Sequence, residues 1–234
     1  MNLYTKVFGV PHLGTQIRAP YVMKHVDVHL GDFILDAGCG PAGFYSFECA
    51  FEGAKVVSLD VSKEKVRELR NVSKKVGLRY MFHFITADIC ALPIKAGVFD
   101  TILSVSVIEH IQHDVKAIAE QTRVLRKNGH FIIHVPQPTP TFFANLDYKS
   151  FDQVREGYTL KHIKPLLEKC GLKVVVHQDT IKAFACLAIE ISYTIRRPIL
   201  RVLICPLLYL LSRLDFLSNR TGRGLLLVAT KSKN

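Results

Sequence analysis

The 234-residue sequence lacks several features that mark other classes of protein. Its six cysteines form no C-x-x-C pair, and several lie in apolar segments, where a thiol behaves as a small hydrophobic side chain. This usage fits a reducing compartment. The first residues, MNLYTKVFGVPHLG, lack the basic-then-apolar layout of a secretory signal, so we expect a cytoplasmic location.

Internal repeats and low-complexity segments are also absent, and apolar residues make up 49% of the chain against 22% charged residues. That composition is typical of a globular protein. The length suits one well-buried core, so we expect a single domain over residues 1–234, with residues 1–30 as an N-terminal cap.

Acidic residues are scarce relative to basic ones, at 20 against 31, which gives a net charge of +11. Such an excess favours an anionic surface, either nucleic acid or the inner leaflet of a membrane. Charge alone does not choose between them. The excess is concentrated in two stretches, 63–79 and 182–223.

Short runs rich in Val, Ile and Phe alternate with helical segments. This β/α alternation predicts an α/β fold with a Rossmann-like, doubly wound and mostly parallel sheet. After Pro136 a Pro-rich loop precedes a helix that Gly171 closes, followed by two more strands. The seven strands are expected at residues 32–37, 55–60, 82–88, 100–106, 129–135, 172–178 and 224–230.

The run FILDAGCGPAGF, residues 33–44, carries three glycines at the spacing G-x-G-x-x-G directly after the first strand. Such glycines allow a tight turn, close approach of a ligand and close packing of the next helix. Asp60 ends the second strand, where a carboxylate accepts hydrogen bonds from a ribose diol. A nicotinamide dinucleotide and S-adenosylmethionine both suit these features. Asp36 separates them, because a pyrophosphate would be repelled by it while an ammonium and a sulfonium would be attracted.

At this point the sequence resembles the class I S-adenosylmethionine-dependent methyltransferases, whose first motif is an acid-x-Gly-x-Gly run; here it reads DAGCGPAG. The resemblance extends over residues 30–136. TADICALPI carries Asp88 after the third strand, GVFDTILSVSVIEHI has Phe-Asp before the fourth strand and Glu-His after it, and RVLRKNGHFIIHVP matches the next helix, glycine turn and strand.

The resemblance implies S-adenosyl-L-methionine as the cofactor. By the same resemblance, Asp36 and the glycine backbone hold its methionine end, Asp60 its ribose and Asp88 its adenine, while Ser104 lies beneath the methionine. The full implied cofactor-binding set is Asp36, Ala37, Gly38, Cys39, Gly40, Gly43, Asp60, Val61, Asp88, Ile89, Ser104 and Val105.

Methyl transfer depends mainly on aligning two reactants, and a hydroxyl acceptor also needs a base to remove its proton. The segment IEHIQHD follows the fourth strand and so lies near the reactive end of the cofactor. His110 is the first candidate base and His113 the second, while Glu109 orients either histidine or binds a substrate hydroxyl. The alternative is that His110 packs against the cofactor loop and His113 faces solvent. No ligand set with zinc spacing and no carboxylate-rich magnesium site is visible, so no metal is predicted.

The insertion between strands six and seven, residues 181–217, is strongly apolar and carries a basic excess. Its apolar runs are too short to span a bilayer, and Pro198 and Pro206 interrupt them. Two readings remain: helices that lie on an anionic membrane or cover the pocket of a hydrophobic acceptor, or helices packed in a dimer interface or in the core.

These features predict a methyltransferase for a small, hydrophobic or lipid-linked acceptor, peripheral on the inner membrane leaflet. Two alternatives stay open. The basic segment KEKVRELRNVSKKVGLR would suit an RNA methyltransferase, although it has no base-stacking aromatic and nucleic acid is the weaker prediction. The second alternative is a non-catalytic protein that keeps the fold for binding alone. The sequence sets neither the oligomeric state nor the methylated atom.

Overall fold

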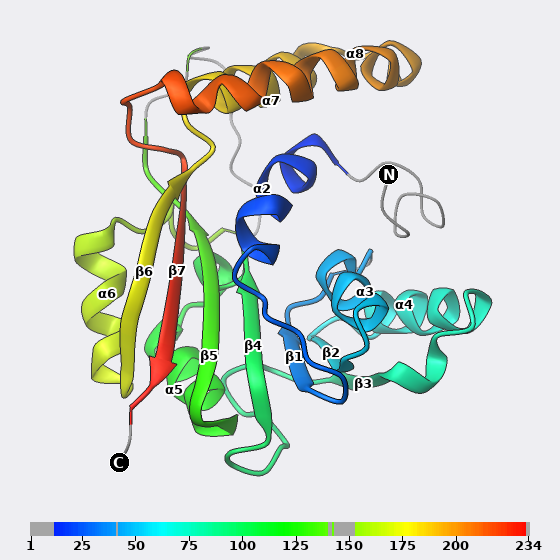
Figure 1. Cartoon of the computed structure of the whole chain (residues 1–234), viewed down its shortest axis with the longest axis vertical. Helices are drawn as coiled ribbons and strands as arrows, with labels where there is room; N and C mark the ends of the chain where they lie inside the picture. Colours follow the sequence, from blue (N-terminus) through cyan, green and yellow to red (C-terminus); the bar gives the residue numbers. More distant parts are fainter. Residues whose placement is uncertain (1–11, 41, 140–141, 143–152, 233–234) are drawn as a thin grey trace.

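The computed structural model describes residues 12–40, 42–139, 142 and 153–232. Its centre is a seven-stranded sheet in the order β3-β2-β1-β4-β5-β7-β6 (Figure 1). The predicted fold class is confirmed, with β5, β7 and β6 paired antiparallel and the other neighbours parallel. The strands are β1 (Phe33–Ala37), β2 (Lys55–Asp60), β3 (Phe82–Thr86), β4 (Phe99–Val105), β5 (Leu125–Pro136), β6 (Leu172–Thr180) and β7 (Gly224–Lys231).

Strand boundaries differ from the predicted ones mainly at β5 and β6. β5 begins four residues early, at Leu125, because Leu125 pairs with Phe99 before a register shift brings His130 opposite Thr101. β6 extends to Thr180, which pairs with Gly224 at the start of β7. β3 ends at Thr86, so Asp88 lies in the loop after the strand. Pairing with a distant strand set these ends, and local sequence carries no sign of it.

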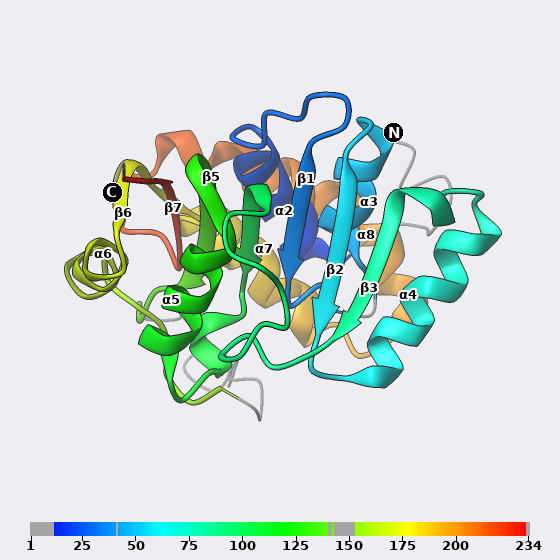
Figure 2. The same ribbon diagram turned by 90° about the horizontal axis from the view of Figure 1, so that it is seen from below.

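Helices cover both faces of the sheet, as Figure 2 shows from below. One hydrophobic core joins the sheet to α5 (Asp114–Val124) and α6 (Leu160–Lys169). A second core joins its other face to α3 (Phe44–Phe51), α4 (Lys63–Lys75) and the end of α2 (Leu13–Met23). Gly171, with φ of +85°, ends α6 as predicted, since only glycine adopts that backbone conformation without strain.

A separate layer, which we call the roof, consists of α2, α7 (Ala183–Thr194), α8 (Pro198–Ser212) and η3 (Arg213–Leu217). α7 and α8 lie across the upper end of the sheet in Figure 1, where the parallel strands end. A third apolar cluster holds this layer together, with Leu13 and Ile17 of α2 packed against Ala185, Ala188 and Leu208. The predicted insertion 181–217 therefore contains two helices, and residues 13–23 of the predicted N-terminal cap join them; residues 1–11 of that cap lie outside the described part.

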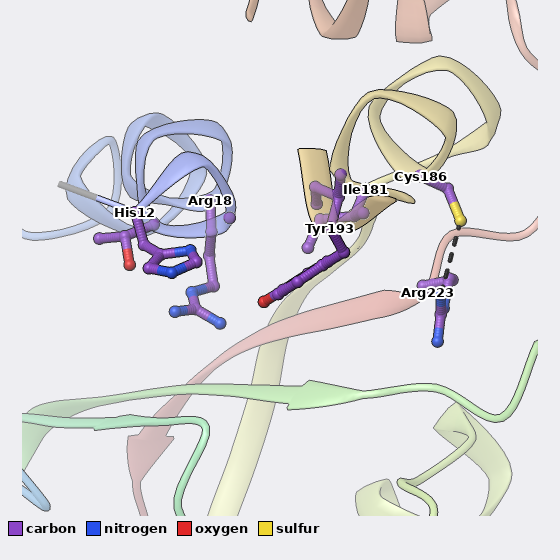
Figure 3. A pocket seen from close by; sticks show the side chains of 9 residues that line it. His12, Arg18, Ile181, Cys186, Tyr193 and Arg223 are labelled. Atoms are coloured by element: carbon purple, nitrogen blue, oxygen red, sulfur yellow. Dashed lines mark hydrogen bonds between the residues drawn. The ribbon is translucent and has the colours of Figure 1, made fainter. Parts of the chain in front are cut away.

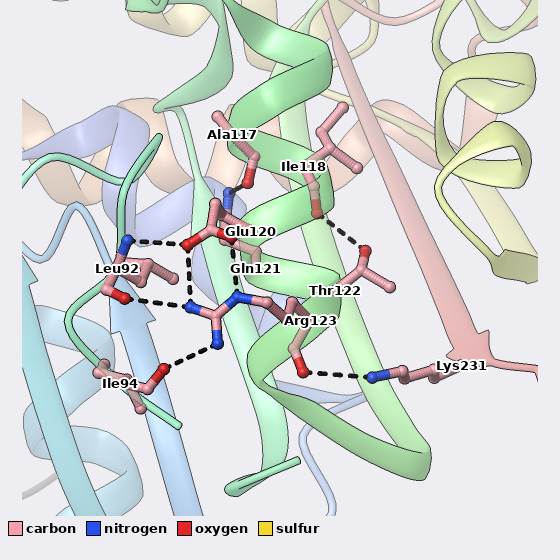
Figure 4. A network of polar contacts seen from close by, with 9 residues as sticks. All are labelled: Leu92, Ile94, Ala117, Ile118, Glu120, Gln121, Thr122, Arg123 and Lys231. Carbon is pink, nitrogen blue, oxygen red and sulfur yellow. Dashed lines mark hydrogen bonds and ion pairs between the residues drawn. The ribbon is translucent and has the colours of Figure 1, made fainter. Parts of the chain in front are cut away.

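A polar network fixes the loop between β3 and β4 against α5 (Figure 4). The Arg123 guanidinium forms an ion pair with Glu120 at 2.8 Å and donates to the carbonyls of Leu92 and Ile94. Glu120 also accepts from the Leu92 amide at 2.9 Å. Charge-assisted bonds of this kind are short and directional. They hold the loop that begins at Asp88, one of the predicted cofactor residues.

Candidate functional site

The glycine turn joins β1 to α3, and its three glycines have different structural roles. Gly38, Gly40 and Gly43 all have positive φ, at +83°, +63° and +52°. A Cβ on Gly38 would lie 2.5 Å from a methyl carbon of Val107, and one on Gly43 would lie 2.3 Å from Leu69 of α4. A Cβ on Gly40 would meet nothing within 4 Å. Two glycines therefore permit close packing, and the third leaves an open backbone surface for a ligand.

Asp60 ties the end of β2 to this turn. One of its carboxylate oxygens accepts from the Gly40 amide at 3.1 Å, and the other accepts from the Ser62 amide at 2.9 Å. A carboxylate has about four acceptor positions, so two stay available for a ribose diol. Ser62, with its side chain accepting from the Lys65 amide, is the N-cap of α4. Asp60 is thus not the helix cap itself.

Asp36, at the end of β1, is buried and bonded within the fold. Its carboxylate accepts from the Ser46 hydroxyl at 2.6 Å, and Ser46 also lies 2.8 Å from the Ser58 hydroxyl. Burial raises the pKa of Asp36 to about 6, which the Ser46 hydrogen bond partly opposes. The carboxyl is beside the glycine turn, as predicted, but it is held by α3 and is only 3% exposed. Its action on a methionine ammonium would be electrostatic.

Two exposed residues, Val61 and Asp88, and the buried Ile89 follow the ends of β2 and β3. Val61 is 75% exposed although it is apolar, which fits the face of a nucleoside. Asp88 is exposed and accepts from the Cys90 amide at 2.8 Å, leaving its other oxygen available, and Ile89 beside it is buried. The remaining predicted residues lie in or directly after β1 and at the end of β4: Ala37, Cys39, Ser104 and Val105. Burial raises the pKa of the Cys39 thiol, which disfavours its thiolate form.

These residues fit S-adenosylmethionine. Gly40 provides the close approach, Asp60 has free acceptor positions, Val61 offers an apolar face, and the buried hydroxyl of Ser104 has no hydrogen-bond partner among the described residues. The assignment of each residue to a part of the cofactor stays a prediction.

The predicted catalytic segment follows β4 as a short 3-10 turn, η2 (Ile108–His110). The His110 side chain is 31% exposed, and its Nε2 lies 3.9 Å from Glu109. Glu109 is 1% exposed, and one of its carboxyl oxygens has no partner in the described part of the chain. Burial raises its pKa to about 7. His113 is exposed and precedes α5. The structure therefore places Glu109 with His110 and leaves His113 facing solvent.

The segment 153–158 holds η2 and the residues after it in place. The carbonyl of Glu109 accepts from the amides of Val154 and Arg155. The Arg155 guanidinium donates to the carbonyls of Ile111 and Gln112 at 2.6 and 2.9 Å. Tyr158 donates to Asp114 at 2.8 Å, and burial raises the pKa of its hydroxyl. The predicted catalytic segment is therefore fixed by backbone and side-chain contacts that no motif revealed.

Sequence reasoning missed Arg18. The Arg18 guanidinium reaches from α2 to the end of β4, where it donates to the Ser106 hydroxyl at 2.7 Å and to Tyr45 at 3.3 Å. Ser106 has a positive φ of 56°, a conformation unusual for a residue other than glycine. Such strain is common at functional sites. A long stretch of sequence separates Arg18 from Ser106, so only the tertiary fold brings them together.

A pocket of about 350 Å³ lies between α2 and α7, above this point (Figure 3). The Arg18 side chain and the Tyr193 ring point into the space between the two helices, and Cys186 and Arg223 lie at its other end. The lining residues are His12, Gly14, Thr15, Arg18, Ile181, Cys186, Ile189, Tyr193 and Arg223.

Within the described residues, His, Cys, Asp and Glu side chains form no cluster of three or more that could hold a metal ion. In the same part of the chain, no helix is long and apolar enough to cross a bilayer.

Comparison with known proteins finds a methyltransferase domain in the chain. Residues 35–133 match a family model described as Methyltransferase domain. The chain is similar to the sterol 24-C-methyltransferase of Eremothecium gossypii, at 23% identity over 167 residues, covering 68% of this chain and 45% of that protein. It is also similar to the norajmaline N-methyltransferase of Rauvolfia serpentina, at 32% identity over 100 residues, covering 43% of this chain and 34% of that protein. The chain thus spans less than half the length of these relatives.

A solved structure of a geranyl diphosphate methyltransferase in complex with SAM aligns with a TM-score of 0.68, covering 92% of this chain and 84% of that one. The sequence identity is 13%, so this likeness concerns the fold. The aligned region includes the sheet and also extends over much of the chain beyond the matched domain.

Proposed function

The chain carries a class I S-adenosyl-L-methionine-dependent methyltransferase domain, and from that premise we propose that it methylates a small, hydrophobic or lipid-linked acceptor at an anionic membrane surface. The observation that carries this proposal is the roof. It lies over the carboxyl end of the parallel strands, where α/β folds bind their ligands. Its inner side lines a pocket, and its outer side exposes apolar residues.

The pocket supports an acceptor with apolar parts. Ile181, Ile189 and the Tyr193 ring contribute apolar surface, and Arg18 links the pocket to Ser106 beside the glycine turn. The relatives named above act, by their names, on a sterol, on norajmaline and on geranyl diphosphate, which are small organic molecules. These names support the class of acceptor and do not identify it.

The chemistry assigned to the protein is alignment, exclusion of water and proton removal. S-adenosylmethionine, when bound, supplies an activated methyl group. Gly40 and Asp60 position the cofactor end of the site, and the roof covers the acceptor end. For a hydroxyl acceptor, His110 is the candidate base, with Glu109 at 3.9 Å to orient it or to stabilise its protonated form. A carbon or nitrogen acceptor would place different demands on these two residues.

The outer face of α8 supports contact with a membrane. Ile199, Leu203, Leu207 and Leu210 follow one another at helical spacing and are 63–78% exposed, and Phe216 beyond the helix is 78% exposed. The opposite face of α8 packs on α7 and α2 through the third apolar cluster. Such an amphipathic helix lies in the plane of an interface with its apolar side among the lipid chains.

The exposed charges of the roof favour an anionic lipid. The two acids of residues 182–220, Glu190 and Asp215, are 0% and 4% exposed. Arg196, Arg197 and Arg213 are exposed beside the apolar stripe. Every exposed formal charge on this part of the roof is therefore positive, which complements an anionic leaflet.

Labelled S-adenosylmethionine tests the proposed reaction. The protein is incubated with the label and with separate lipid and RNA fractions of a cell extract, and the fraction that gains label is identified. We expect the lipid fraction to gain label with wild type and to lose it with His110→Ala. Label in RNA alone would overturn the proposal in favour of an RNA methyltransferase, and label in neither fraction would overturn the assigned activity.

Vesicle cosedimentation tests the membrane contact. Arg196, Arg197 and Arg213 are changed together to Glu, and a control changes Arg67, Lys74 and Lys75 of α4 to Glu. Each basic residue near an anionic surface contributes about 1 kcal/mol, so loss of three weakens binding roughly 10²-fold. We expect that loss on anionic vesicles for the roof variant only, and weaker binding of wild type in high salt. Equal binding by the two variants would contradict a role for α8.

A further inference from the structure

A second cavity, of about 540 Å³, adjoins the pocket between α2 and α7. The two share Ile181, Cys186 and Arg223 in their linings, so they are neighbours at the start of α7. The second cavity adds the basic residues Lys182 and Arg220 to its lining. Neither lining contains an aspartate or a glutamate. A cavity that binds a purely apolar acceptor would need no basic residues in its lining.

Within the described residues, the Arg18 guanidinium forms no hydrogen bond to an acidic group and donates only to neutral hydroxyls. Its Nε and Nη1 donate to the Tyr45 and Ser106 hydroxyls, which carry no charge. A guanidinium has five N–H donors, so three of them, including both on Nη2, have no partner among the described residues. The side chain is half-buried, where an unpaired charge is costly. These donors are available to an anion in the pocket.

The nearest acids do not supply that anion. Glu109 forms no ion pair with Arg18 in the described part of the chain. Burial raises the pKa of Glu109 to about 7, although the Arg18 charge partly opposes this rise. Glu190 is engaged elsewhere: it pairs with Arg223 at 3.3 Å and accepts from the Phe142 amide at 3.0 Å. His134, buried beneath the pocket, has its pKa lowered by burial and by Arg18, so it stays neutral.

We propose that the methyl acceptor is an anionic amphiphile, whose carboxylate or phosphate binds Arg18 near Ser106 and whose apolar part lies against Ile181, Ile189 and Tyr193. Arginine suits this role because its planar donors bind two oxygens of one anion at once. Lys182 and Arg220 at the second cavity favour entry of a negatively charged molecule. This inference rests on the proposed function, since it names the acceptor of the same site.

Matched ligands that differ only in the head group test the proposal of an anionic acceptor. Decanoate, decyl phosphate and decanol are titrated by calorimetry, below their micelle concentrations, into protein saturated with S-adenosylhomocysteine. We expect at least one of the two anionic ligands to bind about tenfold or more tightly than decanol, as a charge-assisted bond to a half-buried Arg provides. Inorganic phosphate is a fourth arm, and we expect it to bind far more weakly than decyl phosphate.

Variants test whether Arg18 causes the preference for an anionic head group. Arg18→Gln should bring the affinities for the anion and the alcohol close together, Arg18→Lys should keep part of the preference, and Arg67→Gln, which removes the same charge from α4, should keep all of it. The Arg196, Arg197 and Arg213 variant should also keep the preference, because those residues lie outside the pocket.

Equal affinity of wild type for all three ten-carbon ligands would overturn the inference whatever the variants do. The inference would also fail if Arg18→Gln weakened the binding of decanol and of the anions equally, since that result indicates a purely structural role for Arg18. It would fail as well if inorganic phosphate bound as tightly as decyl phosphate. Titration with S-adenosylmethionine is run on the same samples. Binding of this cofactor without a head-group preference rejects the inference alone, and absence of cofactor binding rejects the proposed function.

Discussion

The cofactor turn and the roof, the two halves of the site, are built by different means. The turn is made by backbone: positive-φ glycines, and amides of Gly40 and Ser62 that donate to one carboxylate. The roof is made by side chains from distant parts of the chain, such as Asp215, which accepts from the amides of Lys182 and Ala185 at the start of α7. Backbone geometry suits a cofactor common to many enzymes, and side-chain assembly suits an acceptor that differs among them.

This difference has an energetic consequence. A change in the turn should alter cofactor affinity, and a change in the roof should alter acceptor binding or stability while leaving the cofactor alone. Glu109 and His110 lie where the halves meet, so changes there should affect the reaction itself. The predictions below proceed from the largest expected effect to the smallest.

His110→Ala should lower the turnover number on a hydroxyl acceptor by roughly 10²–10⁴-fold, the usual contribution of a positioned base. Cofactor affinity should change little, because His110 is not part of the turn. Turnover is measured at saturating acceptor and cofactor, with His113→Ala as the matched control, since His113 is exposed. An unchanged turnover number for His110→Ala would leave this residue a packing role.

Glu109→Gln should change how stability depends on pH. Burial raises the pKa of Glu109 from 4.5 to about 7, so the folded protein holds a proton that the unfolded chain releases. The stability gained from that proton is fully present below pH 4.5 and is lost as pH rises through 7. Relative to wild type, the variant should therefore gain on the order of 3 kcal/mol in free energy of unfolding across this interval. Denaturant titrations at several pH values measure the difference, and parallel curves would contradict the raised pKa.

Asp60→Ala should weaken S-adenosylmethionine binding by about 1.5–3 kcal/mol, roughly 10- to 100-fold, through loss of charge-assisted bonds to the turn and the ribose. The control is Glu64→Ala, which removes an exposed carboxylate four residues later. Calorimetry measures both. If the two variants bound the cofactor equally well, the assignment of Asp60 would fail.

Asp215→Ala should destabilise the roof by about 0.5–2 kcal/mol, the usual cost of losing a helix cap. The reason is that two amides at the start of α7 lose their acceptor. Asp215→Asn, which keeps the shape and one acceptor oxygen, should cost less. Thermal unfolding monitors stability, and cofactor titration should give wild-type affinity for both. Reduced cofactor affinity in Asp215→Ala would show that the halves are not independent.

The success of sequence-based prediction also differs between the cofactor turn and the roof. The sheet, the glycine turn and the position of Asp60 were predictable, because they depend on local apolar periodicity and on glycines at fixed spacing. The hydrogen bonds of Asp36 with Ser46 and of Arg18 with Ser106 were not, since both join residues from different elements. The composition of α8 also did not show whether this helix packs against the protein or faces solvent. The structure shows that it does both, with one face in the third apolar cluster and one exposed.

The most direct test of the account is a pair of calorimetric titrations on the same protein, one with S-adenosylmethionine and one with a nicotinamide dinucleotide. Asp36, Asp60 and Asp88 surround the glycine turn with acidic groups, which suits a sulfonium and an ammonium and repels a pyrophosphate. We predict saturable binding of S-adenosylmethionine and none of the dinucleotide. Tight binding of the dinucleotide with no binding of S-adenosylmethionine would contradict the account.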